Sequence, residues 1–102
     1  MSNIIYEYRL DNDGTKSVVV PEGSTVLCVQ VQNDAPYVWI NIEKEGENLR
    51  VFNFRTILTG QPFEQSIREV YLETVQVGWV VLHVYVSEDY PTLEQERSHY
   101  VL

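Results

Sequence analysis

The stretch TVLCVQVQNDAPYVWINIE, residues 25–43, decides the fold of this chain. Apolar or aromatic residues recur at every second position on both sides of Asn33-Asp34-Ala35-Pro36, a segment rich in turn formers. This alternation predicts two antiparallel strands joined by a tight turn. On each strand one alternating set is expected to face the core, namely Leu27, Val29, Val31, Val38, Ile40 and Ile42.

The opposite face of the same two strands mixes amide and aromatic side chains. It carries Gln30, Gln32, Tyr37, Trp39 and Asn41. This composition is typical of a partly wetted surface that meets a ligand or a partner. It is therefore the first candidate binding surface of the chain, although no catalytic or cofactor motif accompanies it.

Period-two alternation predicts five further strands, over residues 4–10, 16–20, 49–56, 68–76 and 79–87. The glycine of Asp13-Gly14 is expected to supply a hairpin turn between the first two strands, and the acidic run at residues 43–48 a solvated hairpin tip. Seven short strands without repeats predict an all-β fold, a small antiparallel β-sandwich or barrel with at most one short C-terminal helix.

Residues 1–87 are expected to form a single β domain, and residues 88–102 a C-terminal tail or short docking helix. In the latter, Thr92 is placed to cap a helix that runs through Arg97. Residues 57–67 break the alternation with Gly60 and form a loop longer than a hairpin turn requires. Loops of this length often carry function.

The composition excludes several classes of function. Seven basic against fifteen acidic side chains give a net charge of −8, which repels nucleic-acid phosphates, so no nucleic-acid binding is expected. One cysteine and two histidines give no zinc spacing, so neither a metal nor another cofactor is predicted. No signal-peptide layout or membrane-length apolar run is present, which favours the cytoplasm and no membrane. A 102-residue chain gains buried area by forming a homo-oligomer, which we expect.

Several segments together resemble a family of small uncharacterised proteins found mainly in tailed phages and prophages. The resemblance spans about residues 4–86, and the segments that carry it are Tyr6, residues 26–33 with Pro36 and Trp39, residues 50–54, Thr59-Gly60-Gln61-Pro62, and Leu82-His83-Val84-Tyr85. The chain departs from that pattern at Asp34 and Gln61. The resemblance implies the setting of a phage protein in the cytoplasm of its host. Small phage proteins of similar size are thought to sequester nucleotide immune signals in oligomers, which implies a similar anti-defence role.

Catalysis is not predicted. His83 and Tyr85 share a strand face, as a proton-transfer pair would require. However, no serine or cysteine lies in a nucleophile motif, and no carboxylate pair is fixed by spacing. A non-enzymatic binding protein is therefore the favoured class.

A nucleotide-derived ligand needs rings for stacking, amides for the base edge, and cations or backbone N–H groups for phosphate. The candidate residues are Gln30, Gln32, Tyr37, Trp39, Asn41, Arg50, Arg55, Gly60, Arg68, Trp79, His83 and Tyr85. Arg50 or Arg55 is the candidate phosphate ligand, and the sequence predicts that Arg55→Glu abolishes binding without disturbing the fold. The alternative is a structural or protein-docking β module, such as a virion component or an inhibitor of a host protein, because aromatic residues are also enriched at protein interfaces.

Overall fold

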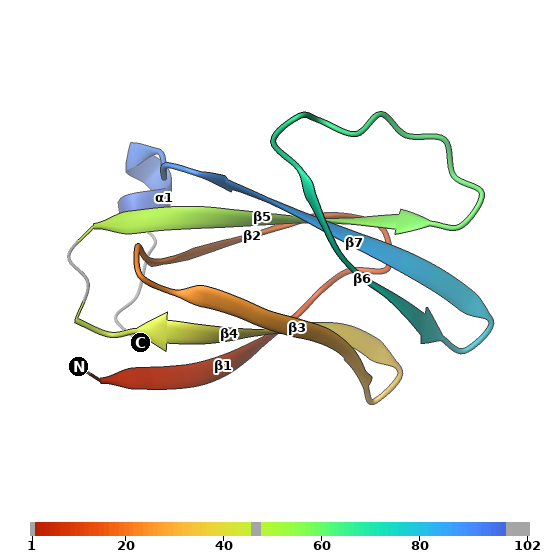
Figure 1. The fold of residues 1–102 in the computed structure, drawn as a ribbon, viewed down its shortest axis with the longest axis horizontal. Helices are drawn as coiled ribbons and strands as arrows, with labels where there is room; N and C mark the ends of the chain where they lie inside the picture. Colours follow the sequence, from red (N-terminus) through yellow and green to blue (C-terminus); the bar gives the residue numbers. More distant parts are fainter. Residues whose placement is uncertain (1, 46–47, 98–102) are drawn as a thin grey trace.

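A computed structural model describes residues 2–45 and 48–97, which form two antiparallel sheets packed face to face (Figure 1). The elements are β1 (Asn3–Arg9), β2 (Gly14–Pro21), β3 (Thr25–Gln32), β4 (Ala35–Glu43), β5 (Leu49–Leu58), β6 (Val70–Val77), β7 (Val80–Asp89) and α1 (Leu93–Arg97). One sheet has three strands in the order β1-β4-β3, and the other has four in the order β2-β5-β7-β6. The expected all-β sandwich of seven strands with one short C-terminal helix is confirmed.

The predicted hairpin over residues 25–43 is formed by β3 and β4. Its loop has only two residues, Asn33 and Asp34, with φ angles of 52° and 60°, because Ala35 already pairs with Gln32. A two-residue hairpin turn of this kind requires positive φ at both positions. Asn and Asp are the non-glycine residues that best tolerate it, so the local sequence accounts for the turn.

The predicted core face of β3 is right at Val29, which is buried, and wrong at Leu27 and at Val31, which lies near the β3–β4 turn and is 38% exposed. The pairing with β4 shifts between Val26 and Cys28, so Leu27 is the extra residue of a β-bulge. Val26 pairs with Ile40 on the core side, and Leu27 is 49% exposed. A strict period of two cannot detect a bulge, because the bulge moves every residue before it to the other face.

The hairpin turn predicted at Asp13-Gly14 and the hairpin tip predicted at residues 43–48 belong instead to connections between the two sheets. β1 pairs with β4 and β2 with β5, so the chain crosses from one sheet to the other at Asp11–Gly14. It crosses back before β3, and again between β4 and β5. At the first crossing Leu10 is buried and its amide donates a hydrogen bond to the Pro36 carbonyl, at 2.8 Å. The burial of Leu10 and its hydrogen bond hold the connection between β1 and β2 against the end of the sandwich that contains Pro36.

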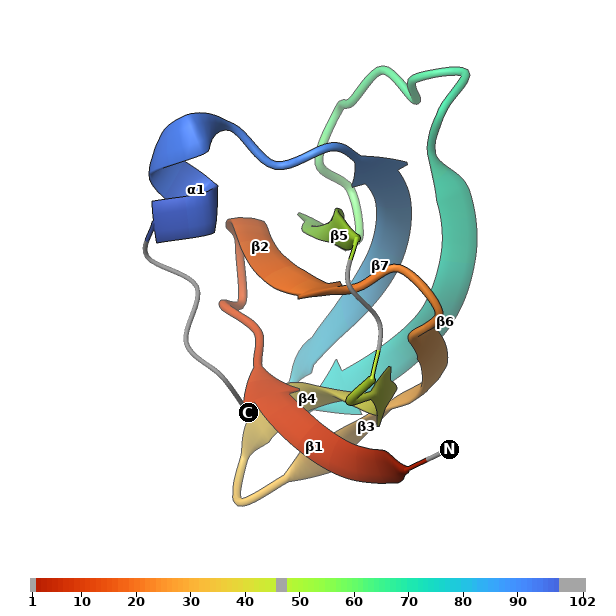
Figure 2. The ribbon, with the colours of Figure 1, turned by 90° about the vertical axis from the view of Figure 1, so that its left-hand side faces the viewer.

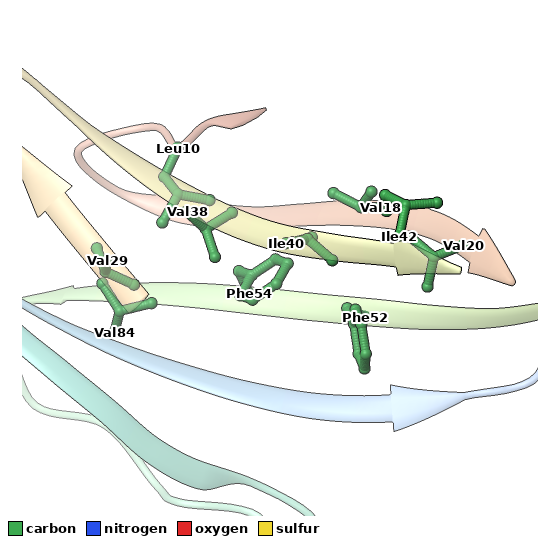
Figure 3. Packing of buried hydrophobic residues seen from close by; sticks show 10 residues of the cluster. All are labelled: Leu10, Val18, Val20, Val29, Val38, Ile40, Ile42, Phe52, Phe54 and Val84. Atoms are coloured by element: carbon green, nitrogen blue, oxygen red, sulfur yellow. The ribbon is translucent and has the colours of Figure 1, made fainter. Parts of the chain in front are cut away.

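The core lies between the two sheets. Its main cluster contains Leu10, Val18, Val20, Val29, Val38, Ile40, Ile42, Phe52, Phe54 and Val84 (Figure 3). Phe54 and Ile40 are fully buried and lie between β5 and β4. On β1, Tyr6 and Tyr8 pack against this cluster. Burial, and secondarily the neighbouring Tyr6, raises the pKa of Tyr8 above its usual 10.0.

The C-terminal segment begins later than expected, because β7 continues to Asp89, two residues beyond the predicted boundary at residue 87. Thr92 caps α1 as predicted: its Oγ1 accepts the Gln95 amide at 3.1 Å, and the Gln95 side chain accepts the Thr92 amide at 2.9 Å. Figures 1 and 2 show α1 beside the end of β2. The predicted docking of residues 99–102 lies outside the described residues. Within residues 2–45 and 48–97, no helix has the length and apolar character needed to cross a bilayer.

Candidate functional site

The predicted binding residues lie on both outer faces of the sandwich and do not converge on one pocket. Val38, Ile40 and Ile42 point into the core, so the alternate residues of β4 point outward from the three-stranded sheet. That outer face holds five of the predicted residues, Gln30, Gln32, Tyr37, Trp39 and Asn41. Arg55, His83 and Tyr85 belong instead to the outer face of the four-stranded sheet.

On the three-stranded sheet, Trp39 and Asn41 are packed rather than open. The Trp39 Nε1 and the Asn41 Oδ1 are both buried and have no hydrogen-bond partner among the described residues. A side chain that reads the edge of a base must present its polar atoms to the ligand. The buried Oδ1 of Asn41 is therefore poorly placed for the edge contact that the sequence predicted for this residue.

The four-stranded sheet carries a row of three aromatic rings on its outer side, which we call the aromatic face (Phe63, Tyr71 and Tyr85). The ring centroids of Phe63 and Tyr85 lie 5.5 Å apart, and those of Tyr71 and Tyr85 lie 5.7 Å apart. Tyr71 is 50% exposed and Phe63 is 42% exposed. The rings contact each other at tilted or edge-on angles, which leaves no parallel gap for a base.

His83 lies beside the aromatic face in a continuous chain of hydrogen bonds. Its Nδ1 is 3.0 Å from the Thr74 hydroxyl, which is 2.6 Å from the Tyr71 hydroxyl. Its Nε2 is 2.7 Å from the Thr59 hydroxyl, which donates to the Val81 carbonyl at 3.2 Å. Both ring nitrogens of His83 are therefore engaged by threonine hydroxyls of the chain.

Arg55 anchors the loop of residues 59–69, which runs along the outside of the four-stranded sheet (Figures 1 and 2). Its Nε and Nη2 donate to the two carboxylate oxygens of Glu69 at 2.8 and 2.6 Å, and Nη2 also donates to the Glu64 carbonyl at 2.9 Å. Its guanidinium lies 5.3 Å from the centroid of the Phe63 ring. Arg55 therefore holds Phe63 and the loop in place, and its charge is already matched.

Arg50, near the start of β5, and Arg68, just before β6, line one cavity of about 330 Å³. The Arg50 guanidinium lies 4.2 Å from the centroid of the Tyr90 ring and donates to Glu22 at 2.6 Å. The remaining residues that line this cavity are Glu88, Asp89 and Tyr90. Two arginines are thus brought together as a phosphate site requires, but carboxylates accompany them.

Trp79 and Gly60 lie at the end of the sandwich that holds the β6–β7 turn. Trp79 is 99% exposed and lines a hollow of about 400 Å³ together with Leu58, Thr59, Val80 and Val81. Gly60 has a φ of 88° and follows Thr59 in the turn that leaves β5. Neither residue contributes to the aromatic face.

Sequence reasoning missed Phe63, Tyr71 and Tyr90. Tyr71 shares a face with Thr74, three residues away, because the pairing of β6 shifts between Tyr71 and Glu73. Phe63 lies in an irregular loop, where no period predicts the direction of a side chain. Nothing in the sequence around Tyr90 indicates that an arginine forty residues earlier stacks on its ring.

Comparisons with known proteins give one match. Residues 1–94 match the model of a family described as "Domain of unknown function (DUF7352)". No curated protein and no solved structure shows a significant match to the chain.

Proposed function

The chain belongs to the family described as "Domain of unknown function (DUF7352)", and from its own surfaces we propose that it is a non-enzymatic protein-docking module. The docking surface is the aromatic face, formed by Phe63, Tyr71 and Tyr85. The observation that carries this proposal is the row of three mutually packed, partly exposed rings. Tyrosine and phenylalanine are enriched in the buried centres of protein interfaces.

The side chains of the aromatic face are held by contacts within the chain. The ion pair between Arg55 and Glu69 fixes the loop that carries Phe63, and the bond to Thr74 fixes the hydroxyl of Tyr71. Binding to a preformed surface loses less side-chain entropy than binding to a mobile one. The engaged state of His83 also supports docking over catalysis, since both of its ring nitrogens are occupied within the protein.

The partner that this surface fits is a basic protein. The chain carries a net charge of −8, and the loop that bears Phe63 also bears Glu64. A positively charged partner is attracted to such a chain over a distance of about 10 Å at moderate salt. The resemblance to tailed-phage proteins, which rests on the sequence alone, supports a host or virion protein as this partner.

Replacing either exposed ring by alanine is expected to weaken docking. Tyr71→Ala and Phe63→Ala each remove a central contact, and loss of such a contact costs about 2 kcal/mol, or roughly thirtyfold in Kd. The measurement is affinity capture with the full chain as bait, followed by titration of the purified captured protein. We also expect its association rate to fall as ionic strength rises.

The matched control is Ile5→Ala, which removes an exposed apolar side chain from the other sheet. A specific partner is retained by the wild type and by Ile5→Ala and is lost from both aromatic-face variants. If every captured protein is retained equally by all four baits, the aromatic face is not the docking surface.

A second candidate function is sequestration of a nucleotide-derived signal, and the convergence of Arg50 and Arg68 at Tyr90 favours it. In this function Tyr90 stacks on the base and Arg68 meets the phosphate. Arg68 forms no ion pair or hydrogen bond through its guanidinium within the described part of the chain. We rank this function second because Glu22 pairs with Arg50, and Glu88 and Asp89 line the cavity, which disfavours a polyanion.

Arg68→Glu separates the two functions. Because Arg68 is exposed and forms no ion pair among the described residues, the variant is expected to keep its fold. If the chain sequesters nucleotides, equilibrium dialysis with AMP and a cyclic dinucleotide detects binding that the variant lacks. Under the docking proposal neither nucleotide binds the wild type, and Arg68→Glu captures the same partner as the wild type does.

A further inference from the structure

The turn between β6 and β7 exposes an apolar surface that the aromatic face does not include. Gly78, with a φ of 60°, reverses the chain, and Trp79 follows it with 99% of its surface in solvent. Beside the ring lies the hollow of about 400 Å³, lined otherwise by Leu58, Thr59, Val80 and Val81. The hydroxyl of Thr59 is bonded to the Val81 carbonyl and to His83, so the polar group of this wall is satisfied internally.

We propose that this surface, which we call the Trp79 surface, is the contact between two copies of the chain. It presents a projecting ring and a recess side by side. In a two-fold symmetric dimer the same patch faces itself, so a contact from residue i to residue j is made twice. The Trp79 ring of each copy then fills the recess of the other copy, which is large enough for an indole.

The absence of charge on the Trp79 surface allows a second copy of this acidic chain to dock there. Two chains of net charge −8 repel each other wherever their carboxylates meet. The five residues that line the Trp79 surface carry no charge. Two copies can therefore meet here without placing like charges in contact, and tryptophan is the residue type most often found at the energetic centre of protein interfaces.

The buried area makes this dimer contact a small interface. Each indole buries roughly 150–250 Å². The two rings and the walls that they cover thus bury about 600–1,000 Å² in total, below the roughly 1,200 Å² of ordinary specific interfaces. Interfaces of this size are characteristic of weak, transient complexes, so the chain is expected to exchange between monomer and dimer at micromolar concentrations.

The test is sedimentation equilibrium of the full chain from about 5 μM to about 1 mM. The wild type is expected to pass from monomer to dimer, and Trp79→Ser is expected to remain monomeric, with Kd raised at least tenfold. The control is Ile67→Ser, which removes an apolar side chain of equal exposure that lines no part of the hollow. It is expected to dimerise as the wild type does.

A second readout does not depend on how Trp79→Ser folds. In a Trp39→Phe background Trp79 is the only tryptophan, and the substitution removes a buried indole N–H that has no partner among the described residues. The fluorescence emission of Trp79 in this variant is expected to shift to shorter wavelength as protein concentration rises, because dimerisation takes the Trp79 ring out of water. A wild type that stays monomeric at 1 mM, a dimer that survives Trp79→Ser, or an emission spectrum independent of concentration would each overturn the proposal.

Discussion

Phe54→Ala is expected to lower the free energy of unfolding by about 3–5 kcal/mol. Phe54 has no exposed surface, and its ring packs between the two sheets, 6.1 Å from the ring of Phe52. Truncation removes its buried apolar surface and leaves a cavity that the surrounding strands only partly close. Domains of this size have roughly 5–15 kcal/mol of stability in all, so this single change removes a large share. Urea titration followed by circular dichroism measures it.

The matched control for this prediction is Phe63→Ala, the same chemical change at a ring that is 42% exposed. Its expected loss is about 1 kcal/mol, because a partly exposed ring gives up less buried area. A loss below 1 kcal/mol for Phe54→Ala would contradict the position of that ring at the centre of the core.

Arg55→Glu is expected to have the second largest effect, about 2–4 kcal/mol of destabilisation. The Glu69 side chain is only 10% exposed, and Arg55 is its partner in two hydrogen bonds. The variant leaves the Glu69 carboxylate without a cation and places a second carboxylate against it. We expect the loop of residues 59–69 to detach, which limited proteolysis detects as new cleavage within it.

Reversing the pair provides the control. Arg55→Glu combined with Glu69→Arg restores opposite charges and is expected to recover at least half of the lost stability. Wild-type stability and an uncleaved loop in the single variant would show that the ion pair does not hold the loop. The sequence alone predicts that Arg55→Glu keeps its fold, and the contact with Glu69 is what changes that expectation.

The candidate sites illustrate how far sequence reasoning extends. Alternation correctly predicts that His83 and Tyr85 share a face, and likewise Tyr37, Trp39 and Asn41. It does not reveal that the two sets lie on opposite outer faces, because a period of two specifies sides within one strand and not the sheet to which the strand belongs. For the same reason the nucleotide pocket expected from the sequence is divided between separate surfaces.

The sequence by itself determined the strands, the β3–β4 turn at Asn33-Asp34 and the capped helix after Thr92. These features depend on backbone geometry and on side chains a few residues apart, so local residue types are sufficient. Only the tertiary structure decided the crossings between sheets, the bulge at Leu27 and the pairing of Arg55 with Glu69. The crossings and the bulge depend on which strands bury their apolar faces together, and the ion pair depends on how the loop of residues 59–69 folds back onto β5. All three are set by contacts between residues distant in the chain.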